Sequence, residues 1–110
     1  MRGLMGQYFE QALVGGRAHW IKSFAHEPAL SRLTVFLADD VDSANPTRSV
    51  EFLEVEQVDI TWTDRDDNRH EGLLGAHEEE HSGQVHYMLV TEQRDITITA
   101  RRRAVVHTVR

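Results

Sequence analysis

Residues 85–100 read VHYMLVTEQRDITITA, and apolar and polar side chains alternate through most of this stretch. Val85, Tyr87 and Leu89 fall on one side of an extended chain, and Ile96 and Ile98 repeat the pattern after a polar connection. A period of two indicates a β-strand with one buried face, and the short connection suits a hairpin. The stretch therefore predicts two adjacent antiparallel strands.

The same alternation continues outward through residues 17–25, 33–37 and 105–109, each of which we expect to be a strand. Residues 50–62 alternate as well, but the pattern slips phase near Glu56 and Gln57, which indicates a bulge or tight bend or, alternatively, two short strands. The side chains expected to supply much of the core are Trp20, Phe24, Leu33, Val35, Leu37, Ile60, Trp62, Tyr87, Leu89, Ile96 and Ile98.

Two segments break the strand pattern. Apolar residues at spacings of three and four over residues 4–14 predict a helix, which Gly15 and Gly16 would end. Residues 64–83 are strongly polar and are expected to form a long loop. The sequence therefore predicts one α+β domain over 1–110, with an N-terminal helix packed on a twisted antiparallel sheet of about six strands. The alternative is an all-β sandwich or half-barrel, in which residues 4–14 form a strand.

Composition narrows the classes of function. The chain has 110 residues, no cysteine and a formal net charge of -6. The charge argues against binding to nucleic acid or to an anionic membrane surface, and it permits a basic protein partner. We expect a cytoplasmic protein, because cysteine is absent and neither a signal peptide nor a membrane span is evident.

Residues 77–81 read HEEEH and satisfy the H-E-x-x-H pattern. On a helix, His77 and His81 would face one way and bind zinc, while Glu78 would activate the bound water as a general base. The flanking residues lack the apolar face that such a helix needs, so the preferred expectation is a solvated loop with no cofactor and no catalytic residue. A small zinc-dependent hydrolase remains the alternative hypothesis.

Carboxylates are concentrated in the middle of the chain. An acidic surface attracts a basic protein and accelerates its association. The residues expected to bind a partner are Asp64, Asp66, Asp67, Glu78, Glu79 and Glu80.

Three segments resemble a group of β-rich bacterial immunity proteins that neutralise polymorphic toxins. They are residues 23–27 (SFAHE), 51–55 (EFLEV) and 95–100 (DITITA). The resemblance implies a binding module that acts by occluding a toxin, and it assigns no individual binding residue. The leading hypothesis is therefore a non-enzymatic protein-binding module of immunity type, which acts through an acidic surface. Exposed sheet edges would also allow a homodimer.

Overall fold

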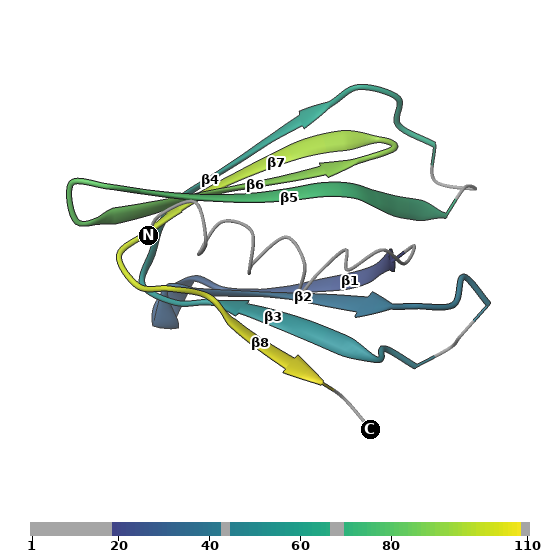
Figure 1. Cartoon of the computed structure of the whole chain (residues 1–110), viewed down its shortest axis with the longest axis horizontal. Coiled ribbons are helices and arrows are strands. Elements are labelled where there is room, and N and C mark those ends of the chain that lie inside the picture. Colours follow the sequence, from purple (N-terminus) through teal and green to yellow (C-terminus); the bar gives the residue numbers. More distant parts are fainter. Residues whose placement is uncertain (1–18, 43–44, 67–69, 109–110) are drawn as a thin grey trace.

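A computed structural model describes residues 19–42, 45–66 and 70–108, and nearly all of them lie in or between antiparallel β-strands (Figure 1). The strands are β1 (His19–Glu27), β2 (Arg32–Ala38), β3 (Arg48–Phe52), β4 (Val55–Trp62), β5 (Glu71–His81), β6 (Gln84–Thr91), β7 (Arg94–Ala100) and β8 (Val105–Thr108). A single 3-10 turn, η1 (Pro28–Leu30), follows β1, because Pro28 cannot donate to the strand ladder.

The predicted α+β class is wrong for this part of the chain. The described residues contain no α-helix, and they form eight strands rather than about six. The helix expected over residues 4–14 lies outside the described residues, as does the strand that the alternative placed there. The all-β character of that alternative is what the described residues show.

All eight strands belong to one sheet, in the order β4-β7-β6-β5-β1-β2-β3-β8. Figure 1 shows this sheet folded into two layers, with β4, β7, β6 and β5 in one and β1, β2, β3 and β8 in the other. A short ladder joins the layers, in which His19, Trp20 and Ile21 of β1 pair with residues 71–73 of β5. Folding a sheet on itself buries one face of each layer against the other.

The predicted loop over 64–83 is also wrong, because β5 occupies residues 71–81. Ser82 and Gly83 both have positive φ, 52° and 80°, and connect β5 to β6 as a two-residue hairpin turn. Such turns match the right-handed twist of the strands that they join. The polar residues 77–81 are therefore part of a long paired strand.

The phase slip near Glu56 marks a change of strand. β3 ends at Phe52 and β4 begins at Val55, with Glu54 in the left-handed region at φ 49°. The register between β4 and β7 also shifts between Val55 and Gln57. Both predicted explanations, two strands and a bulge, therefore apply.

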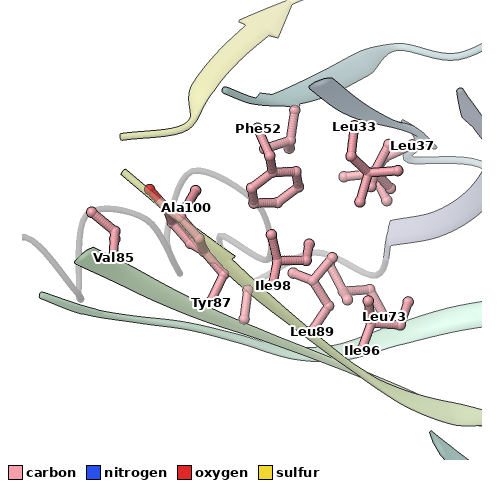
Figure 2. Close-up of a cluster of buried hydrophobic side chains, with 13 residues drawn as sticks. Leu33, Leu37, Phe52, Leu73, Val85, Tyr87, Leu89, Ile96, Ile98 and Ala100 are labelled. Atoms are coloured by element: carbon pink, nitrogen blue, oxygen red, sulfur yellow. The ribbon is translucent and has the colours of Figure 1, made fainter. Parts of the chain in front are cut away.

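The core lies between the two layers (Figure 2). The ring of Phe52, from β3, meets the ring of Tyr87, from β6, edge to face with centroids 5.0 Å apart. The predicted core residues that are buried are Leu33, Val35, Leu37, Tyr87, Leu89, Ile96 and Ile98. Ile60 and Trp62 are 46% and 41% exposed, so their prediction as core residues is wrong.

Candidate functional site

The HEEEH segment is extended. His77 pairs with Met88 and His81 pairs with Gln84 in the ladder between β5 and β6. Four residues of a strand span about 13 Å, whereas the zinc motif needs two histidines one helical turn apart. Among the described residues, no three histidine or carboxylate side chains are grouped closely enough to hold a metal ion. The segment therefore lacks the helical geometry on which the zinc hypothesis depended.

The three glutamates of this segment do not form one acidic surface. Glu78 and Glu80 lie opposite Tyr87 and Val85, on the face of the sheet that carries the core. Glu79 lies opposite His86 on the other face. Successive side chains of a strand point to opposite faces, so a partner cannot contact all three glutamates together.

Glu78 is hydrogen-bonded to the buried hydroxyl of Tyr87. The same hydroxyl accepts a hydrogen bond of 2.7 Å from the backbone N–H of Ala104. Burial raises the pKa of the Tyr87 hydroxyl, although the bond from Ala104 acts in the opposite direction. Burial also raises the pKa of Glu78, while the nearby Arg103 lowers it. Tyr87 thus ties β5 and the segment after β7 to the core.

Replacing Tyr87 by phenylalanine is expected to reduce the free energy of unfolding by about 1–3 kcal/mol, because the Ala104 N–H and Glu78 lose their partner. The effect should depend on pH. The folded-state pKa of Tyr87 lies above its ordinary value of 10.0, so its contribution is present below pH 10 and is lost as the pH rises. Urea unfolding measured between neutral and alkaline pH tests this expectation. If the variant lost stability with alkali as steeply as the parent protein, Tyr87 would not be the group responsible.

Asp64 and Asp66 follow β4 and are anchored to the turn between β6 and β7. The backbone N–H of Asp64 donates to the carbonyl oxygen of Gln93 at 3.0 Å, and that of Asp66 donates to the Gln93 side-chain oxygen at 3.2 Å. Asp67 lies outside the described residues. Gln93 lies in the turn after β6, so Asp64 and Asp66 are at that end of the strand. Glu80 pairs with Val85 near the beginning of β6. The predicted partner-binding carboxylates therefore lie at opposite ends of the sheet.

A largely buried ion pair lies close to Gln93. Arg94 donates through Nε and Nη2 to the two carboxylate oxygens of Glu71, at 2.7 and 2.8 Å. The hydroxyl of Thr91 donates to the same carboxylate at 2.7 Å. The side chains of Arg94 and Glu71 are only 12% and 11% exposed. Two parallel bonds to a carboxylate fix both the position and the plane of the guanidinium.

Aromatic rings further restrain this guanidinium. The Arg94 Cζ lies 4.5 Å from the ring centroid of Phe24 and 4.5 Å from that of Trp62. A second guanidinium, that of Arg65, lies 4.8 Å from the Trp62 ring. Cation–π contacts of this kind are stronger where the cation has lost water, as Arg94 has.

A cavity of about 330 Å³ opens beside the ion pair, and we call it the Arg94 pocket. Residues from β1, β4, β5, β7 and their connections line it: Ile21, Lys22, Trp62, Asp66, His70, Glu71, Gln93 and Arg94. Its size is at the lower end of the range for small-molecule sites. No pattern in the sequence unites these residues, because they come from separate strands and match no spacing motif.

A second candidate surface is the outer edge of β4. Within the described strands, β4 pairs only with β7 and ends the sheet. Ile60 lies opposite the buried Ile96, and Trp62 lies opposite Arg94, so both point to the core-bearing face although they remain exposed. The edge thus combines backbone groups that no described strand pairs with exposed apolar side chains.

Comparison with known proteins finds no matching family model, curated protein or solved structure. Among the described residues, no helix is both long and apolar enough to cross a membrane.

Proposed function

We propose that the protein is a non-enzymatic binding module that captures a basic, extended segment of a protein partner along β4. The observation that carries the proposal is the edge of β4, along which no other described strand pairs, with Ile60 46% and Trp62 41% exposed. An extended peptide can add to such an edge as a further strand, with backbone hydrogen bonds supplying affinity and side-chain contacts supplying specificity. An immunity-type inhibitor that covers a basic surface of a toxin would act in this way.

Charge along β4 favours a basic partner. The carboxylates on or next to this strand are Glu54, Glu56, Asp59, Asp64 and Asp66. Glu54 and Glu56 form ion pairs with Arg102 and Arg101, at 3.4 and 3.0 Å. These ion pairs are exposed, and exposed ion pairs contribute little to stability. An arginine or lysine of the partner can therefore take the place of Arg101 or Arg102 with little loss of free energy.

The same carboxylates disfavour pairing between two copies at this edge, because it would bring two acidic strands together. The proposal therefore assigns β4 to a different, basic protein, and a homodimer would have to use another surface.

We also propose the cytoplasm as the compartment, since the chain has no cysteine with which to form a disulfide in an oxidising compartment.

The direct test uses blocked peptides of the length of β4, in which arginine, glutamine or glutamate alternates with threonine. The arginine peptide should bind, and the glutamate peptide should not. Alternate residues of the added peptide direct their N–H groups toward β4. N-methylation of that set should abolish binding because it removes these donors, whereas N-methylation of the other set should not. Calorimetry measures each affinity. Failure of the arginine peptide to bind, or equal binding of the glutamine peptide, would contradict the proposal.

Charge-reversed variants locate the surface. Asp59→Arg and Asp64→Arg should each slow association with the arginine peptide several-fold at low salt, because steering by charge acts on the association rate. Glu79→Arg is the matched control: it makes the same change of charge on β5, which is separated from β4 by β7 and β6. Equal slowing by all three variants would mean that net charge, and not the β4 edge, governs binding.

A further inference from the structure

The guanidinium of Arg94 has donors that the described part of the protein does not use. Its Nε and Nη2 bond to Glu71, whereas no described group accepts a hydrogen bond from Nη1. The side chain is only 12% exposed and lines the Arg94 pocket. A largely buried donor is stabilised by an acceptor, and the Arg94 pocket, which opens to solvent, can admit water or a ligand group that supplies one.

Two further donors line the same pocket. Lys22 donates one hydrogen bond, to the carbonyl oxygen of Val41 at 2.7 Å, which leaves two of its three N–H groups available. The rings of His70 and Trp20 meet edge to face with centroids 6.3 Å apart, and no hydrogen bond joins the His70 nitrogens to the described residues. Arg94, Lys22 and His70 can therefore all donate to a molecule in the pocket.

The acceptors on the wall are largely occupied. Both oxygens of Glu71 already accept bonds from Arg94 or Thr91, and the side-chain oxygen of Gln93 accepts the N–H of Asp66. The Asp66 carboxylate repels an anion here, and its charge offsets that of Lys22. Glu71 offsets the charge of Arg94 in the same way. The pocket therefore selects a ligand by its excess of hydrogen-bond donors more than by net charge.

We propose that the Arg94 pocket binds the oxyanion of a small organic molecule, a carboxylate or a phosphate monoester, with an apolar or aromatic part beside Ile21. Arginine recognises these oxyanions because its donors lie in a fixed plane, and Arg94 is held by Glu71, Phe24 and Trp62 before any ligand arrives. A volume of about 330 Å³ accommodates such a group together with a ring. The proposal is separate from strand capture by β4, although Trp62 borders both surfaces.

The single lysine of the chain makes the test specific. Phenyl phosphate, benzoate, inorganic phosphate and benzyl alcohol are each titrated into the full chain. The readouts are tryptophan fluorescence and the rate at which an amine-reactive ester modifies Lys22, followed by mass spectrometry. Phenyl phosphate or benzoate should change the fluorescence and protect Lys22, and benzyl alcohol, which has the ring without the anion, should do neither. Binding by one aromatic anion and not by the other would identify the oxyanion within the proposal.

Variants decide whether binding occurs in this pocket. Lys22→Gln should weaken the aromatic anion about tenfold, as expected for the loss of a hydrogen bond to a charged group, and His70→Gln should weaken it less. Arg102→Gln is the matched control, because it removes an exposed cation beyond the opposite end of β7. The proposal would be overturned if neither aromatic anion bound at millimolar concentration. It would also be overturned by equal losses of affinity in Lys22→Gln and Arg102→Gln, or by inorganic phosphate binding as tightly as phenyl phosphate.

Discussion

Replacement of Phe52 by alanine is expected to lower the free energy of unfolding by about 3–5 kcal/mol. The ring is fully buried and lies between the two layers of the sheet, where it meets Tyr87 edge to face (Figure 2). The substitution removes the apolar area of the ring from the core and leaves a cavity, and it also removes the contact with Tyr87. A domain of this length is stable by roughly 5–15 kcal/mol, so the loss is a large fraction of the total.

Chemical denaturation followed by circular dichroism measures this loss. Ile60→Ala is the control, because Ile60 is 46% exposed at the β4 edge and its truncation should cost less than about 1 kcal/mol. The two positions look alike in the sequence, since each is a large apolar residue in an alternating strand. Similar losses of unfolding free energy in Phe52→Ala and Ile60→Ala would mean that the side chains of β4 are as buried as those of β3.

The contrast between Phe52 and Ile60 shows how much of this fold local sequence pattern can predict. Alternation correctly located the strands that contain Leu33, Tyr87 and Ile96, because each has one face against the core. The pattern of β4 is the same, yet Ile60 and Trp62 are exposed. Alternation reports which side chains share a face, whereas coverage of that face depends on the order of strands in the sheet.

β5 was missed for a different reason. Its second half is made of histidine and glutamate, residues that propensity assigns to loops or helices. It is a strand because its residues 73–81 pair with β6, and because the turn at Ser82 and Gly83 sets that register. Pairing between strands supplies backbone hydrogen bonds that no inspection of residues 77–81 alone could reveal.

The Arg94 pocket was not predictable from spacing. Glu71 and Arg94 are 23 residues apart, and they become neighbours only because β5 pairs with β6 and β6 pairs with β7. Of the predicted partner-binding residues that the structure describes, Asp66 alone lines this pocket. The sequence indicated where carboxylates are frequent, but the position of each one depended on strand register.

Substitution of Glu71 by glutamine is expected to cost about 3–5 kcal/mol of stability, because it leaves the charge of Arg94 buried without a counter-ion. Glutamine keeps the size of the side chain, so the loss reports charge rather than packing. Glu27→Gln is the matched control: Glu27 pairs with Arg32 at 3.0 Å, but both side chains are substantially exposed, so the cost there should be much smaller than at Glu71. Equal costs at the two sites would mean that the Glu71–Arg94 pair is solvated like a surface pair.

The same substitution separates the structural role of the ion pair from its role in the Arg94 pocket. In Glu71→Gln, the uncompensated charge of Arg94 should bind phenyl phosphate more tightly than in the parent protein, even though the fold is weaker. The bound anion should then raise the melting temperature of Glu71→Gln more than that of the parent protein, since a ligand stabilises the state that it binds. The double variant Glu71→Leu, Arg94→Met should recover most of the lost stability, because well-packed apolar residues can replace a buried pair, but it should not bind the anion. A double variant that still bound phenyl phosphate would show that Arg94 is not the group that holds the oxyanion.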